Sequence, residues 1–135
     1  MKKLVQLLAL MLVGILSNVT TMAQTGAPAG ITFQGIATDA SGNIAMNATV
    51  FVKDAIIQTS ATGTTLYSES FSNLKTTEDG VFTITIGQGV KISDGTFSAI
   101  NWANGPYFLN LQVAIKPAAA SNAWTPTYYL SLIHI

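Results

Sequence analysis

The feature that most constrains this chain is an alternation of apolar and polar side chains at successive positions. In residues 107–115 the large apolar side chains fall on every second position, with Asn110 and Gln112 on the opposite face. Residues 82–86 repeat the pattern, with Thr83 and Thr85 between the apolar positions. A period of two places one face of an extended segment against a core, so both segments are predicted to be half-buried β-strands.

Further strands are predicted wherever this pattern recurs between turn residues. The segments are residues 31–37, 50–56, 64–71 and 127–133. Gly, Asp and Asn punctuate them at residues 39–43, 78–80, 94–95 and 104–106, where they favour turns. No apolar repeat of helical period is evident after residue 23. We therefore predict an all-β fold, an antiparallel β-sandwich of about six or seven strands preceded by a cleavable signal helix.

Asp54 does not fit its predicted strand. It falls on the same face as Val50, Val52 and Ile56, which is the face that should meet the core. Burying an unpaired carboxylate is costly, so we expect a bulge or a strand end at Asp54 rather than a buried carboxylate.

The N-terminal segment has the layout of a secretory signal peptide. Lys2 and Lys3 precede an apolar run over residues 4–16, and small residues lead up to Ala23. The run is shorter than the roughly 20 residues of a spanning helix. We expect cleavage after residue 23, a linker over residues 24–30, the sandwich over residues 31–131, and a secreted protein that is extracellular or on the cell surface.

Composition excludes several classes of function. The 135 residues include no Cys, so disulfides and Cys-based metal or redox sites are ruled out. There is no Arg, and the formal net charge is zero at pH 7, which leaves little to bind the phosphates of a nucleic acid. We expect no nucleic-acid partner and, after signal cleavage, no membrane span.

No catalytic constellation is found. His134 is next to the last residue, where few neighbours can orient it for a triad. Glu78 and Asp79 are adjacent, but Asp79 with Gly80 is a turn signature rather than an acid–base pair. Residues 87–89 (GQG) lack the Lys and the helix of a phosphate-binding loop, so they are interpreted as a strand exit. We expect no enzyme, no catalytic residue and no cofactor.

Metal ligands are also not predicted, although calcium is left open at the turn clusters. The oxygen-bearing turn residues are Asp39, Asn43, Asp79 and Asp94. Their spacing matches no known calcium loop, since the alternating ligands and the distal Glu of an EF-hand are missing.

The long connection over residues 87–105 carries Phe97, Ile100 and Trp102. We expect these side chains to fold back as a lid over the open end of the sandwich, because large aromatics are mostly buried. The alternative is that Trp102 lines a sugar- or peptide-binding surface with Tyr107. The candidate stacking residues of such a surface are Trp102, Tyr107, Trp124, Tyr128 and Tyr129.

Several short motifs follow one another along the chain: ITFQGIA at 31–37, ATVFV at 48–52, TGTTLYSE at 62–69, DGVF at 79–82, IGQG at 86–89, INW at 100–102 and GPYFL at 105–109. In this order they resemble the N-terminal β-domain of large secreted surface and tail-fibre-like proteins of Bacteroidota. The likeness covers nearly all of residues 31–131, and the part over residues 102–109 is the most specific. The first two motifs and the turn between them, with DGVF, are also similar, more weakly, to transthyretin-like, carboxypeptidase-regulatory-type modules.

This resemblance implies a structural or adhesive module and supplies no catalytic residues. Residues 128–131 fit the family's last strand, but residues 132–135 depart from it and are similar to sequencing-adapter sequence. We expect the natural chain to continue past residue 131, with 132–135 a non-native or truncated tail.

Together these observations predict a secreted, non-catalytic structural or adhesion module of a longer cell-surface or fibre-like protein. The alternative is a carbohydrate-binding module that uses exposed aromatics. The expected partners are a protein or a glycan at the cell surface. Self-association through an edge strand is also expected, because few Lys protect the strand edges.

Overall fold

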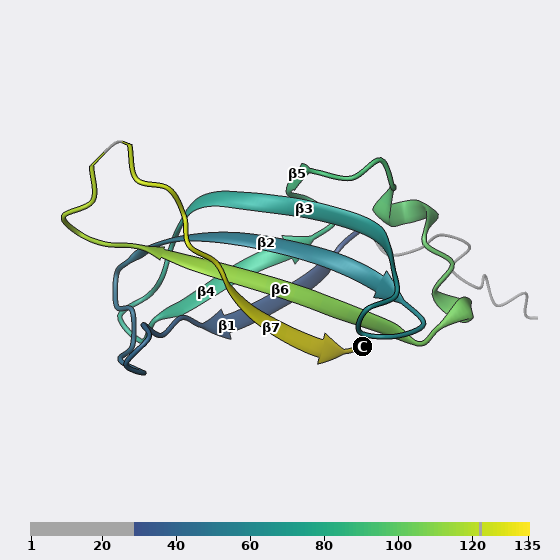
Figure 1. Ribbon diagram of the computed structural model, residues 1–135, viewed down its shortest axis with the longest axis horizontal. Coiled ribbons are helices and arrows are strands. Elements are labelled where there is room, and N and C mark those ends of the chain that lie inside the picture. The colour runs from purple at the N-terminus through teal and green to yellow at the C-terminus, as the bar shows by residue number, and fades with distance from the viewer. Residues whose placement is uncertain (1–28, 122) are drawn as a thin grey trace, which may run out of the picture.

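The computed structural model describes residues 29–121 and 123–135, and it is built almost entirely of strands (Figure 1). The predicted signal peptide lies outside the described residues. The described elements are β1 (Ile31–Ile36), β2 (Thr49–Gln58), β3 (Thr64–Lys75), β4 (Val81–Ile86), β5 (Val90–Lys91), the 3-10 helices η1 (Phe97–Ala99) and η2 (Trp102–Asn104), β6 (Tyr107–Lys116) and β7 (Tyr129–His134).

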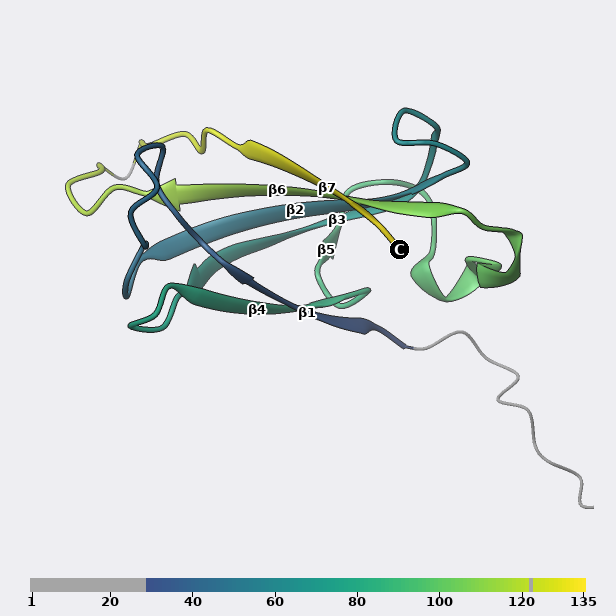
Figure 2. The same cartoon turned by 90° about the horizontal axis from the view of Figure 1, so that it is seen from below.

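The strands form two antiparallel sheets that lie face to face. The larger sheet has the order β5-β3-β2-β6-β7, and the smaller pairs β1 with β4. Figure 2 shows the smaller sheet as a separate layer beneath the larger one. The predicted antiparallel β-sandwich is therefore confirmed.

The core lies between these layers and follows the alternation in the sequence. Val50, Val52 and Ile56 of β2 are fully buried, and Ile84 and Ile86 of β4 are buried as well. Thr83 and Thr85, which alternate with the buried positions of β4, lie on its outer face, as a period-two segment requires. Burying such side chains supplies the main favourable term for folding.

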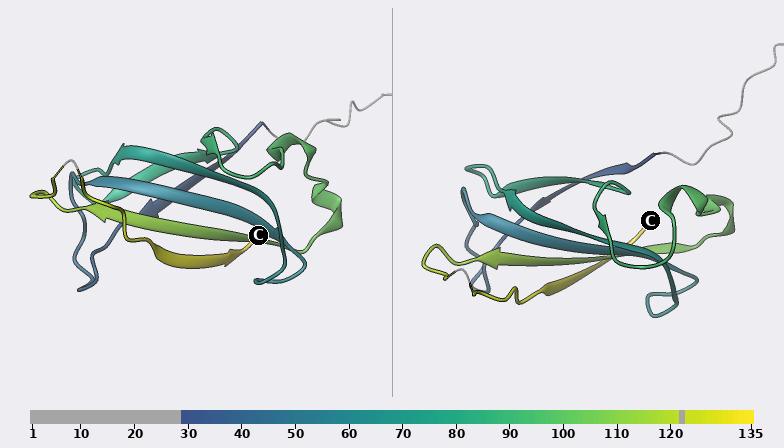
Figure 3. Two further views of the ribbon diagram at one scale, coloured as in Figure 1. Left: turned by 45° about the horizontal axis from the view of Figure 1, so that its top comes forward. Right: turned by 90° about the horizontal axis from the view of Figure 1, so that it is seen from above.

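The connection from β5 to β6 closes one end of the sandwich. Figure 3 shows η1 and η2 beside the start of β6. Phe97 and Ile100 are only 4% and 7% exposed, and Trp102 packs against the core as a half-buried side chain. The expectation of an apolar lid is confirmed.

The expectation for Asp54 is wrong. β2 runs through this position without a break, and its register shifts lie on either side, between Val50 and Val52 and between Ile56 and Ile57. Asp54 is 2% exposed, and Glu69 of β3 stands directly opposite it. In the sequence Asp54 looks like an isolated carboxylate, but the register of β2 against β3 places Glu69 opposite it.

The two strands at the ends of the larger sheet differ from the sequence interpretation. β5 has two residues, too few for an alternation to be recognised, and was not predicted. β7 pairs with β6 from Tyr129 opposite Val113 to His134 opposite Phe108. The strand predicted over residues 127–133 is thus present as β7, which begins two residues later and ends one residue later, so the sandwich extends past residue 131.

Candidate functional site

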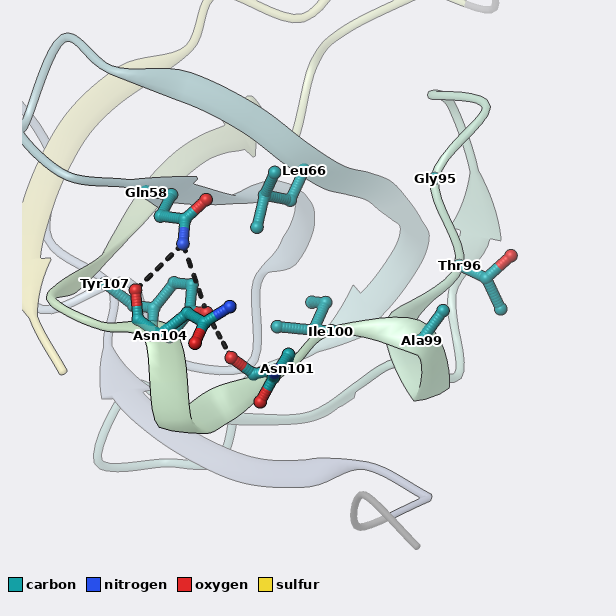
Figure 4. Close-up of a pocket in the computed structure, with 9 residues that line it drawn as sticks. All are labelled: Gln58, Leu66, Gly95, Thr96, Ala99, Ile100, Asn101, Asn104 and Tyr107. Atoms are coloured by element: carbon teal, nitrogen blue, oxygen red, sulfur yellow. Dashed lines mark hydrogen bonds between the residues drawn. The ribbon is translucent and has the colours of Figure 1, made fainter.

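A surface pocket lies where the lid meets the ends of β2, β3 and β6. Its volume is about 270 Å³. Figure 4 shows amide side chains from β2 and from the lid pointing toward its interior. The lining residues are Gln58, Leu66, Gly95, Thr96, Ala99, Ile100, Asn101, Asn104 and Tyr107. We call this site the end pocket.

Hydrogen bonds fix the wall of the end pocket. The Gln58 amide Nε2 donates to the backbone oxygen of Asn104 at 2.8 Å, which ties β2 to the lid. The Tyr107 hydroxyl donates to the backbone oxygen of Asn101 at 2.5 Å. Asn101 also begins η2, and its side-chain oxygen accepts from the backbone N–H of Ala103. Gln58, Asn101 and Asn104 were not predicted as site residues, because nothing in the local sequence distinguishes them from other surface amides.

The aromatic residues predicted for ligand stacking are not gathered on one platform. Tyr107 is 3% exposed and presents almost no ring surface to solvent. Trp102 is half-buried between Phe97 and Tyr107, with ring centroids 5.5 and 5.2 Å away. Its indole N–H is buried without a hydrogen-bond partner in the protein.

Trp124 lies elsewhere, against Phe51, at 5.4 Å between ring centroids. Phe51 alternates with the buried Val50 and Val52, so this contact is on the outer face of the larger sheet. Tyr128 is on that face as well, with the Lys53 ammonium 4.4 Å from its ring centroid. Tyr129, on β7, is 61% exposed.

A second polar cluster is inside the sandwich, centred on Glu69. One carboxylate oxygen accepts from the backbone N–H of Gly87 at 2.5 Å. The other accepts from the backbone N–H of Gly89 at 2.5 Å and from the Tyr67 hydroxyl at 2.8 Å. Burial, together with the hydrogen bond to Glu69, raises the pKa of Tyr67. Residues 87–89 therefore form a backbone cradle for a carboxylate of the protein itself.

Glycine is required at both ends of this cradle. Gly87 has a φ of 98°, which L side chains rarely adopt, and an added Cβ would lie 2.8 Å from the Phe97 ring. A Cβ at Gly89 would lie 2.9 Å from the Glu69 carboxylate itself. The interpretation of residues 87–89 as a strand exit was therefore incomplete. A Gly-x-Gly after a strand is compatible with an anion-binding cradle, but the anion comes from a distant strand.

Asp54 completes the inner cluster. Neither of its carboxyl oxygens has a hydrogen-bond partner, and both are buried. Burial, with the neighbouring Glu69 second, raises the pKa of Asp54 to about 7. We call Asp54 and Glu69 the inner carboxyl pair.

The remaining acidic residues of the candidate list lie in turns. The Asp39 carboxylate accepts from the backbone N–H groups of Ser41 and Asn43 at 2.8 and 2.9 Å, and from the Asn43 amide at 3.0 Å. The Asn43 hydrogen bonds lower the pKa of Asp39. Glu78 and Asp79 occupy an exposed turn, as predicted.

Over residues 29–121 and 123–135, no three His, Cys, Asp or Glu side chains come together as a metal site would require. In the same part of the chain, no helix has the length and apolar character needed to cross a bilayer.

A family model described as a domain of unknown function, DUF8740, matches residues 32–127. The chain belongs to this family. No curated protein and no solved structure matches this DUF8740 chain. The matched region of the DUF8740 domain covers β1 from its second residue, β2 to β6, the lid and the inner carboxyl pair, whereas β7 begins after it.

Proposed function

We propose that this DUF8740 chain is a secreted, non-catalytic structural or adhesion module of a longer cell-surface or fibre-like protein. The observation that supports the proposal is that two carboxylates of the chain accept hydrogen bonds from the chain's own backbone. Glu69 binds the turn after β4, and Asp39 binds its own loop. These carboxylates hold the fold together, while the end pocket is lined by amide, hydroxyl and apolar groups.

A spacer or adhesion module needs stability and an accessible surface, both of which this architecture supplies. The two-layer core extends over both sheets, and the lid closes one end. Export to the cell surface rests on the signal-peptide pattern of residues 1–23. The expected partner is a protein or glycan at that surface.

Two measurements test the proposal together. Mass spectrometry of protein recovered from the cell surface should give Gln24 as the first residue. Beads coated with the purified protein should attach to cells or to immobilised surface glycoproteins, and bovine serum albumin beads should not. Hydrolytic turnover lost on Asp79→Asn or Glu78→Gln would contradict the proposal, as would retention of the uncleaved chain in the cytoplasm.

Carbohydrate binding at the end pocket is the second candidate function. Three residues with amide side chains, Gln58, Asn101 and Asn104, line the end pocket together with the apolar Leu66 and Ile100. Amide and apolar groups together suit the hydroxyls and C–H faces of a sugar. Its volume of about 270 Å³ lies just below the usual range for ligand pockets, so one sugar unit is the appropriate size.

A glycan array compares the amide wall of the end pocket with the aromatic residues on the outer face of the larger sheet. Asn104→Ala removes a lining side chain but keeps the backbone oxygen that Gln58 binds, so the fold should persist while glycan binding falls at least about tenfold. Trp124→Ala is the matched control on the outer face and should bind as the parent does. Loss of binding only with Trp124→Ala would place the site outside the end pocket.

A further inference from the structure

Asp54 and Glu69 occupy directly opposed positions on β2 and β3. Side chains opposed in this way share a face of the sheet, with Cβ atoms about 5 Å apart. Both residues face the interior, at 2% and 0% exposed. Two negative charges so close together, and so poorly solvated, repel strongly, so the pair is not stable with both groups ionised.

The hydrogen-bond donors around the pair are divided unequally. Glu69 accepts from the Tyr67 hydroxyl and from the backbone of Gly87 and Gly89, an arrangement that suits a carboxylate. Asp54 has no donor for either oxygen. A protonated Asp54 does not need an outside donor, because its own carboxyl O–H can donate a hydrogen bond to Glu69.

We infer that Asp54 is a neutral carboxylic acid in the folded protein, that it shares its proton with Glu69, and that loss of this proton loosens the turn at Gly87–Gly89. The inner carboxyl pair is then a pH-sensitive clamp between the two sheets. This inference is independent of the adhesive role, because it concerns only how β2, β3 and the turn after β4 are held together.

The surroundings leave the pair without a compensating cation inside the sandwich. Tyr67 is the other titratable group of β3 on this face, and its hydroxyl is the donor already described. Lys53 adjoins Asp54 in sequence but lies on the outer face, over Tyr128. Lys91 stands opposite Glu69 on β5, yet it is exposed and its ammonium reaches the backbone oxygen of Asp94 at 3.5 Å.

The elements packed on the other sides contribute apolar groups. Leu111 of β6 stands opposite Asp54, and Ser131 of β7 stands opposite Leu111 in the same row. The residues that the smaller sheet contributes to the core are all apolar: Ile31, Phe33, Phe82, Ile84 and Ile86. No positive charge from these facing positions can stabilise a second negative charge.

The direction of the pH effect follows from the raised pKa of Asp54, about 7 against an ordinary value of 3.8. Over the interval between those two values the folded protein holds a proton that the unfolded chain has released. The free energy of unfolding is therefore highest in mild acid, falls as the pH rises through that interval, and levels off above it. An Asp in a salt bridge would give the opposite slope.

A route for the clamp to open exists beside the cradle. A surface pocket of about 450 Å³ lies next to the turn, and its lining includes Tyr67, Gly87, Gly89, Phe97 and the exposed Lys91. When Asp54 ionises, Glu69 is repelled from it. Opening the turn toward this pocket lets water solvate the second charge.

The test is a thermal-unfolding series in pH with three proteins. The parent Tm should fall by about 5–10 °C between about pH 5 and pH 7.5. Asp54→Asn keeps the shape and supplies an N–H donor to Glu69, so its Tm should be nearly constant over that range. Asp94→Asn removes an exposed carboxylate and should retain the parent slope. A parent Tm that is flat or rises with pH overturns the inference.

Two further measurements on the full chain do not depend on Asp54→Asn folding. Carboxyl ¹³C shifts should show one Asp titrating near neutral pH, with an apparent midpoint that belongs to the pair. Hydrogen-exchange protection of the Gly87 and Gly89 amides, corrected for intrinsic rate, should fall over the same range. An Asp54 carboxyl that is already ionised at about pH 5 overturns the inference.

The same series separates a shared proton from a bound cation. Adding calcium to dialysed protein should leave the Tm unchanged, because the Glu69 oxygens already accept three hydrogen bonds. A calcium-induced rise in Tm that Asp54→Asn abolishes would assign the pair to a cation and overturn the inference.

Discussion

The inner carboxyl pair and the end pocket are two places where polar side chains come together, and they differ in how their hydrogen bonds are completed. Glu69 is fully buried and depends on three donors of the protein. The amides of the end pocket stand at the surface, where water or a ligand can complete their bonds. The inner polar groups are therefore expected to contribute to the stability of the fold. The amides of the end pocket are accessible to water or to a ligand.

Replacing Glu69 is expected to have the largest effect. Glu69→Ala leaves two backbone N–H groups and the Tyr67 hydroxyl without an acceptor inside the sandwich, which should cost about 3–5 kcal/mol of unfolding free energy. Urea denaturation near neutral pH measures the loss, with the exposed Glu78→Ala as the control. A loss below about 1 kcal/mol would mean that water already reaches the pair.

Filling the glycine cradle should have the next largest effect. Gly89→Ala places a methyl group against the Glu69 carboxylate and the Phe71 ring, both 2.9 Å from the added Cβ. We expect about 1–3 kcal/mol of destabilisation. Gly105→Ala is the matched control, because its nearest neighbour is 3.5 Å away. Equal effects of the two substitutions would show that the cradle has no special packing.

At the end pocket a smaller effect on stability is expected. Gln58→Ala removes the hydrogen bond to the Asn104 backbone, but solvent can replace the donor, so the loss should be about 1 kcal/mol. Thermal unfolding checks this against Gln112→Ala, a half-buried residue on the outer face of β6. A cost as large as that of Glu69→Ala would break the distinction between the two sites.

The smallest effect on stability is expected at the edge of β7, where association rather than folding should change. Leu130 is 66% exposed on this edge strand. Sedimentation should show self-association of the parent chain, and Leu130→Lys should reduce it while changing stability by no more than about 0.5 kcal/mol. A monodisperse parent monomer would contradict the prediction. Association that persists in Leu130→Lys would place the contact elsewhere.

Much of the fold was predictable because its signals are local. The strand at Val81–Ile86 was predicted within one residue, and β6 was predicted to within one residue at its end, because alternation and turn chemistry both appear within a few positions. The lid was predictable from three large apolar side chains in one long connection. β5 was not, since two residues carry no periodicity.

The candidate site was less predictable. The aromatic residues chosen for stacking are conspicuous in the sequence, but Tyr107 is buried and Trp124 lies on another face. The amides that line the end pocket come from the end of β2 and from η2 and the residue before it, 43 to 46 positions apart in the chain. Only the folding of the lid onto β2 brings them together.

The sequence by itself determined the class of this protein: strands from its two-residue alternation, turns from Gly, Asp and Asn, and the absence of thiol chemistry from the absence of Cys. The tertiary structure alone decided the environment of Asp54. Which residue faces it depends on the register of β2 against β3, and register is set by nonlocal packing of whole strands. That packing turned an apparent defect in one strand into half of a carboxyl pair.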